Sequence, residues 1–159
     1  MSSRLRRGIA GALTGLGMAA IAFVGGWEGL KLKSYKDVVG VWTACYGETK
    51  NIKPGMVFTK PQCDAMFANR LVEFETRMRA CLKAPDAIPD KPYLAFLSLS
   101  YNIGSGAFCK STLVKRANAG DLRGACMEIL KWNRAGGVVW KGLTNRRKAE
   151  NKMCLEGLA

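Results

Sequence analysis

The sequence predicts one α+β domain that is mainly helical and carries a small β-hairpin or sheet. After Thr59 and Gln62, which form the ends of a capping box, apolar residues recur with helical spacing as far as Met78. Residues 93–101 are almost all apolar, as expected of a helix buried on every side. β-branched and aromatic residues flank Gly40, which favours a hairpin turn between two strands.

The rest of the chain adds helices and sets the domain limits. Helices are expected at 111–119, at 121–133 with Asp121 as a cap, and at 143–155. A length of 159 residues, 48% of them hydrophobic, is enough for one domain with a real core. We expect this domain over residues 28–159, preceded by an N-terminal segment over residues 1–27.

The N-terminal segment predicts a membrane span. Residues 8–27 are uncharged and long enough to cross a bilayer as an apolar helix. Three basic residues precede the span: Arg4, Arg6 and Arg7. They predict that the N-terminus stays in the cytoplasm and that the rest of the chain is exported. Six glycines and five alanines make the span weakly apolar, so it should hold poorly in lipid.

Three interpretations of this span compete: a cleaved signal peptide, a permanent anchor, and a weak anchor that is arrested and later released whole. Cleavage after an Ala20-x-Ala22 site would leave five residues before Glu28. That spacing favours the releasable anchor.

The charge and composition of the chain limit the partners it can bind and the kinds of catalysis it can perform. A net charge of +13 favours a polyanionic partner, either nucleic acid or a bacterial envelope. The absence of histidine excludes Ser-His-Asp and Cys-His catalysis and the usual zinc sites, and no metal or cofactor is expected. The six cysteines form no C-x-x-C motif, so they are either disulfides of an exported protein, with the pairing open, or small buried residues.

The residues that bear chemistry follow the N-terminal span. Glu28 is expected on a short helix, Asp37 at the mouth of a hairpin and Thr43 on the returning strand. Glycoside hydrolysis requires a carboxylic acid that protonates the leaving oxygen and a second carboxylate across the sugar ring. A hydroxyl can help to hold the attacking water. Apolar neighbours, here Trp27 and Leu30, would help the acid to keep its proton.

The spacing of Glu28, Asp37 and Thr43, with Tyr46-Gly47 after them, resembles that of the phage-type lysozyme family. The resemblance extends through Ser100-Tyr-Asn-Ile-Gly104, Ser111-Thr-Leu113 and Arg146-Arg-x-x-Glu150. With the N-terminal span, the chain resembles the signal-arrest-release endolysins. In those proteins the anchor leaves a depolarised membrane and the enzyme becomes active.

The resemblance implies a lysozyme-like enzyme that hydrolyses the bond between N-acetylmuramic acid and N-acetylglucosamine in peptidoglycan, by inversion. We expect the enzyme to be a monomer. It implies tethering to the host inner membrane through residues 8–27, with the catalytic domain in the periplasm, and later release. Asn102, Thr112 and Arg146 are expected to contact substrate, although Asn102 could instead cap a helix end. Nucleic acid is not an expected partner, because no nucleic-acid motif accompanies the basic residues.

Two alternatives remain open. A lytic transglycosylase would cleave the same bond without water, but that class manages with one glutamate and would leave Asp37 and Thr43 without a role. A basic protein that disrupts membranes without catalysis would lyse cells even after loss of Glu28. Cys45 and Glu48 depart from the family pattern, which has glycine and histidine there. Cys45 could form a bridge, act as a regulatory thiol or fill the core, and Glu48 could be structural or face the substrate.

Overall fold

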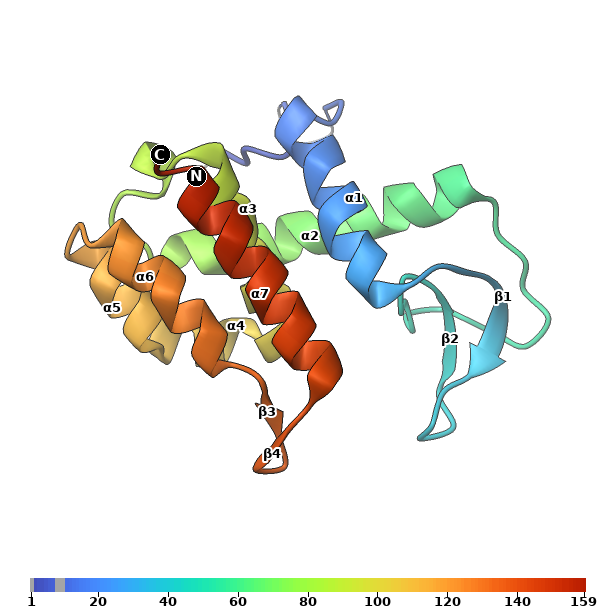
Figure 1. Ribbon diagram of the computed structural model, residues 1–159. Helices are drawn as coiled ribbons and strands as arrows, with labels where there is room; N and C mark the ends of the chain where they lie inside the picture. Colours follow the sequence, from blue (N-terminus) through green and yellow to red (C-terminus); the bar gives the residue numbers. More distant parts are fainter. Residues whose placement is uncertain (1, 8–10) are drawn as a thin grey trace. The chain divides into compact units, whose positions relative to one another are not determined.

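The computed structural model describes residues 2–7 and 11–159, and its backbone divides into two compact units, residues 2–73 and 74–159 (Figure 1). The division falls within the long helix α2 (Lys60–Ala80). Each unit has its own secondary structure and its own disulfide bonds.

The unit over residues 2–73 joins helix α1 (Gly15–Glu28) to a β-hairpin. The hairpin consists of β1 (Lys31–Lys36) and β2 (Trp42–Cys45), which pair antiparallel (Figure 1). The other edge of β1 is extended by a short segment, because Phe58 N–H donates to Leu32 O at 2.8 Å and Ser34 N–H to Met56 O at 2.9 Å. The predicted hairpin is therefore confirmed.

Helix α1 differs from the expected apolar helix over residues 8–27. It begins at Gly15, because Thr14 caps it by accepting the N–H of Gly17 at 3.1 Å. The chain before the cap folds back, with Thr14 N–H donating to Leu5 O at 2.9 Å and Leu5 buried. The helix continues to Glu28, so the expected domain limit at 27/28 lies at its last residue. Residues 8–10 of the expected span lie outside the described residues.

Among the residues described, no helix is both long and apolar enough to cross a membrane.

The unit over residues 74–159 is built around α3 (Asp90–Ile103), in which every residue from Pro92 to Ser100 is buried. The expected all-apolar helix is thereby confirmed. Helix α3 packs against α7 (Lys141–Glu156). The remaining elements are listed here in chain order: a 3₁₀ turn at Pro85–Ala87, α4 (Ser105–Lys110), α5 (Thr112–Asn118), α6 (Leu122–Glu128), a 3₁₀ turn at Ile129–Lys131, β3 (Arg134–Ala135) and β4 (Val138–Val139).

The helix starts agree with the sequence signals. Gln62 Oε1 accepts the N–H of Thr59 at 2.8 Å, and Gln62 N–H donates back to Thr59 Oγ1 at 3.4 Å, which completes the capping box. Asp121 accepts the N–H of Gly124 at 2.8 Å and so caps α6. Helix α4 and the β3–β4 hairpin were not expected from the sequence.

All six cysteines form disulfide bonds: Cys45–Cys63, Cys81–Cys109 and Cys126–Cys154. The bridges close loops of 18, 28 and 28 residues. Loops of this size correspond to about 3 to 4 kcal/mol of stabilisation each, through the entropy lost by the unfolded chain. The open question about Cys45 is therefore answered: this residue is half of a bridge.

Candidate active site

Glu28 is the last residue of α1 and is half-buried. The helix ends there because Gly29 takes a positive φ of 76°, a conformation that glycine adopts without steric cost, and its N–H donates to Gly25 O at 3.0 Å. Trp27 and Leu30, the expected apolar neighbours, are 39% and 36% exposed. The chain then runs directly from Glu28 into β1.

Asp37 lies in the turn of the hairpin and organises it. Its Oδ1 accepts the N–H groups of Val39 at 3.0 Å and Val41 at 2.8 Å. Gly40, at a φ of 82°, donates its N–H to Asp37 O at 3.0 Å, so the predicted role of Gly40 in the turn is confirmed. One carboxylate oxygen is thus committed to the turn, and Oδ2 accepts no hydrogen bond from the part of the chain that is described.

Thr43 is buried in β2, with 4% of its surface exposed, and its hydroxyl donates to Val41 O at 3.1 Å. The register places Tyr35 opposite Thr43, and Asp37 N–H donates to Val41 O at 2.9 Å. Because side chains alternate between the two faces of a strand, Asp37 and Thr43 point to the same face. They are diagonal neighbours, for which the separation is typically about 7–8 Å.

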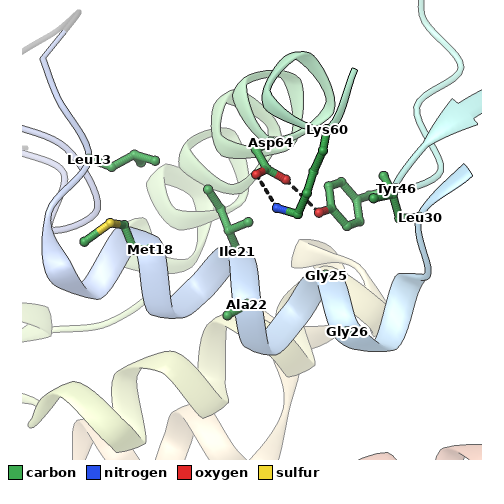
Figure 2. Close-up of a pocket in the computed structure, with 10 residues that line it drawn as sticks. All are labelled: Leu13, Met18, Ile21, Ala22, Gly25, Gly26, Leu30, Tyr46, Lys60 and Asp64. Carbon is green, nitrogen blue, oxygen red and sulfur yellow. Dashed lines mark hydrogen bonds and ion pairs between the residues drawn. The ribbon is translucent and has the colours of Figure 1, made fainter. Parts of the chain in front are cut away.

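The turn that follows Thr43 is fastened to α2. Cys45, which has a positive φ of 56°, is bonded to Cys63, and the Tyr46 ring stacks on Phe67 with ring centroids 4.6 Å apart. The Tyr46 hydroxyl donates to Asp64 Oδ1 at 2.7 Å (Figure 2). In the sequence, Tyr46 stands out only as part of the Tyr46-Gly47 pair that resembles the family pattern. The i, i+4 spacing of Lys60 and Asp64 at the start of a helix predicts an ion pair between them, and this was the only sequence signal near the site where Tyr46 binds Asp64.

Asp64 joins Tyr46 to Lys60, whose Nζ lies 2.6 Å from Asp64 Oδ2. Burial raises the pKa of Tyr46, and its hydrogen bond to Asp64 adds to the rise. Burial alone would raise the pKa of Asp64, but hydrogen bonds from Lys60 and Tyr46 outweigh it and the pKa is lowered. The three side chains stand at one end of a mainly apolar cavity of about 700 Å³ along α1 (Figure 2).

Glu48 closes the same turn. Its Oε1 accepts the N–H groups of Thr49 at 2.9 Å and Lys50 at 2.8 Å, and its backbone pairs with Ala44 in both directions. The contacts of the Glu48 carboxylate are therefore structural. Across the described residues, no three His, Cys, Asp or Glu side chains gather in a way that could hold a metal ion.

The three residues expected to contact substrate lie in the unit over residues 74–159. Thr112 is exposed at the start of α5. Asn102 is exposed near the end of α3, and its Oδ1 accepts from Arg147 Nη1 at 3.1 Å. Arg146 is 5% exposed, and its Nε donates to Glu150 Oε1 at 3.1 Å. The structure thus places two of the three at the surface.

Arg146 and Arg147 form a buried ionic cluster with Glu150. Arg147 Nε lies 2.7 Å from Glu150 Oε2, and Ser98 of α3 donates its hydroxyl to Glu150 Oε1 at 2.6 Å. The sequence resemblance predicts Arg146 as a substrate contact and does not predict its burial. The spacing of Glu150 at i+4 from Arg146 and i+3 from Arg147 was the signal of a mutual interaction.

A mainly helical fold with a small β-hairpin directly after α1 is the architecture of a lysozyme-like glycosidase. The chain belongs to the phage lysozyme family, whose model matches residues 25–150.

Similar proteins agree with this assignment. The chain is 39% identical to the SAR-endolysin of Bacteriophage PS119, over 99% of this chain and 98% of that protein. It is also 39% identical to the SAR-endolysin of Enterobacteria phage P21, over 99% of both. The endolysin from Escherichia coli O157:H7 phage FAHEc1 superposes with a TM-score of 0.80 at 30% identity, covering 90% of this chain and 94% of that one. The expected lysozyme-like fold, mainly helical with small sheets, is confirmed.

Proposed function

We propose that this protein is an endolysin that hydrolyses the β-1,4 bond between N-acetylmuramic acid and N-acetylglucosamine in bacterial peptidoglycan and so lyses the host cell. The observation that carries the proposal is the hairpin register: Asp37 and Thr43 share one face of the hairpin that follows directly from Glu28. Family membership and the endolysin names of the relatives support the substrate.

In the proposed reaction Glu28 is the general acid. It gives its proton to the glycosidic oxygen as the bond from that oxygen to the anomeric carbon breaks. Asp37 stabilises the positive charge that develops on the sugar and accepts a proton from a water molecule that attacks the anomeric carbon. The Thr43 hydroxyl donates to Val41 O, which leaves its lone pairs free to accept the other hydrogen of that water. Attack by a held water inverts the configuration at the anomeric carbon.

Residues of the second unit bind the glycan in this proposal. Asn102 and Thr112 are exposed, so their side chains can contact sugar directly. Arg146 is buried in the cluster with Glu150, so it would act on the substrate through that cluster, whose other arginine holds Asn102. The protein acts as a monomer, and nucleic acid is not its partner.

Mass spectrometry of peptidoglycan fragments tests the reaction, with the Glu28→Gln variant as control. Reducing muramic acid ends that are absent with the variant are the expected result. Anhydro-muramic acid ends would instead establish a lytic transglycosylase. Lysis without fragments, equal for both proteins, would establish a membrane-disrupting protein and overturn the enzyme.

The N-terminal segment is proposed to tether the enzyme before lysis. Residues 8–27 would lie in the host inner membrane, with Arg4, Arg6 and Arg7 in the cytoplasm and the catalytic domain in the periplasm, until release. The SAR-endolysin names of the relatives support this location. Residues 15–28 form α1 in the folded unit, so a tethered chain would lack this helix in its folded place. Equal cleavage rates for membrane-bound and released protein would contradict the proposal.

A further inference from the structure

Tyr46 is held in place at its backbone, its ring and its hydroxyl. Its backbone follows Cys45, which is bonded to Cys63, its ring stacks on Phe67, and its hydroxyl donates to Asp64. All three partners lie on α2, within its first turns. The turn itself is closed by hydrogen bonds between Ala44 and the two residues after Tyr46. The ring is therefore a fixed surface, three residues beyond Thr43 on the same piece of chain.

Helix α1 approaches this surface through Gly25, which is buried. A Cβ at Gly25 would lie 3.0 Å and 3.3 Å from Cε1 and Cδ1 of Tyr46 and 3.2 Å from Cε1 of Phe67. Such distances are shorter than carbon atoms accept at van der Waals contact, so a side chain would displace the helix or the rings. Glycine costs a helix interior about 1 kcal/mol relative to alanine. The close approach gives a reason for a glycine at this position.

A displacement at Gly25 reaches Glu28 directly. The carbonyl of Gly25 accepts the N–H of Gly29, the bond that ends the helix just after Glu28. Tyr46, whose ring lies against Gly25, is only three residues after Thr43 in the chain. The contact between Gly25 and Tyr46 therefore joins the helix that carries one reacting group to the turn beside another (Figure 2).

We propose that Gly25 and Tyr46 are positioning residues for the glycosidase reaction, because their contact sets the place of Glu28 relative to Thr43. The inference rests on the proposed function, in which those two residues act on the same glycosidic bond. A misplacement of reacting groups on the ångström scale can cost about a hundredfold in rate, so a few tenths of an ångström should be measurable.

The chain offers a matched control in the next residue. Gly26 lies in the same helix, and a Cβ there would meet no described atom within 4 Å. Gly25→Ala and Gly26→Ala therefore make the same chemical change at adjacent positions of one helix, with a similar gain in helix propensity, but only the methyl group at residue 25 would meet the two rings. Both variants would be measured in the full chain, with kcat and KM on soluble peptidoglycan fragments and with thermal unfolding.

We expect Gly26→Ala to have the same kcat and KM as the unmodified protein. Gly25→Ala should lower kcat about fivefold, with KM changed less than about twofold. In a second series, Tyr46→Leu should lower kcat in the same selective way, whereas Tyr46→Phe, which keeps the ring, should lose little. In the Tyr46→Leu background Gly25→Ala should cause no further loss, because both changes act on one contact.

Equal kcat values for the Gly25 and Gly26 variants, or additive losses in the double variant, would overturn the inference. A failure of the Gly25 variant to fold would leave the two Tyr46 variants to decide, and equal kcat values for Tyr46→Leu and Tyr46→Phe would overturn it. The Glu28→Gln variant separates this inference from the proposed function. Full activity of that variant would refute the function itself, whereas its inactivity together with equal Gly25 and Gly26 variants would refute the positioning role alone.

Discussion

The ionic cluster between α3 and α7 gives the sharpest prediction for stability. Glu150 is fully buried and faces the guanidinium groups of Arg146 and Arg147, which are 5% and 0% exposed. Glu150→Gln keeps the size of the side chain and one acceptor oxygen, but it removes the negative charge. Both buried cations then lose the negative charge of this partner, and Ser98 loses a charged acceptor.

Removing one partner of a buried ion pair typically costs about 3 to 5 kcal/mol, because the remaining charge stays buried and loses an interaction that offset its desolvation. For a chain of this length such a loss lowers Tm by roughly 10 °C. The matched control is Glu156→Gln on the same helix. Glu156 is 48% exposed and pairs with Lys91 at 3.3 Å, so its loss should cost less than about 1 kcal/mol.

The assay is urea unfolding followed by circular dichroism with the disulfides intact, in which the midpoint and the slope are fitted for each variant. A Glu150→Gln variant that loses no more free energy of unfolding than Glu156→Gln would refute the reasoning. It would mean that the two arginines find water or other acceptors in the folded protein.

Three further predictions concern single interactions. Removing the Cys126–Cys154 bridge by a double alanine substitution should lower the free energy of unfolding by about 3 kcal/mol, since it closes a loop of 28 residues, and a loss below about 1 kcal/mol in urea unfolding would contradict this. Asp121→Ala should cost about 1 kcal/mol through loss of the α6 cap; thermal unfolding would show this as a lower Tm, and an unchanged Tm would count against the cap. The lowered pKa of Asp64 means that its bonds to Lys60 and Tyr46 stabilise the fold above the ordinary pKa of aspartate. This stability is lost as the pH falls from the ordinary pKa of aspartate, about 3.9, through the lowered value, so Asp64→Asn should lose less stability than the unmodified protein between about pH 5 and pH 2. Identical pH dependence of the two proteins would contradict that assignment.

Local sequence signals predicted a large part of the fold because they depend on neighbours in the chain. The capping box at Thr59 and Gln62, the Asp121 cap and the Gly40 turn each involve residues at most three positions apart. The resemblance to the phage-type lysozymes placed Glu28, Asp37 and Thr43, and the register of the hairpin then put two of them on one face.

Features that depend on distant parts of the chain could not be predicted in the same way. The disulfide partners lie 18 and 28 residues apart, and six cysteines allow fifteen pairings. The burial of Arg146 depends on Ser98, which lies 48 residues away on another helix. The start of α1 could not be predicted for a different reason: residues 8–27 form one continuous apolar stretch, which predicts a helix throughout and gives no sign that Thr14 caps a helix within it.

The three disulfides make the fold depend on the compartment in which the chain resides. Their loops together correspond to about 10 kcal/mol, which is comparable to the whole stability of an ordinary domain. A reducing cytosol keeps such cysteines as thiols. Chains made and held there should therefore be only marginally folded and open to proteolysis, whereas oxidation after export would give them a durable structure. Chemical surroundings, as well as a membrane tether, would then restrict where the enzyme can work.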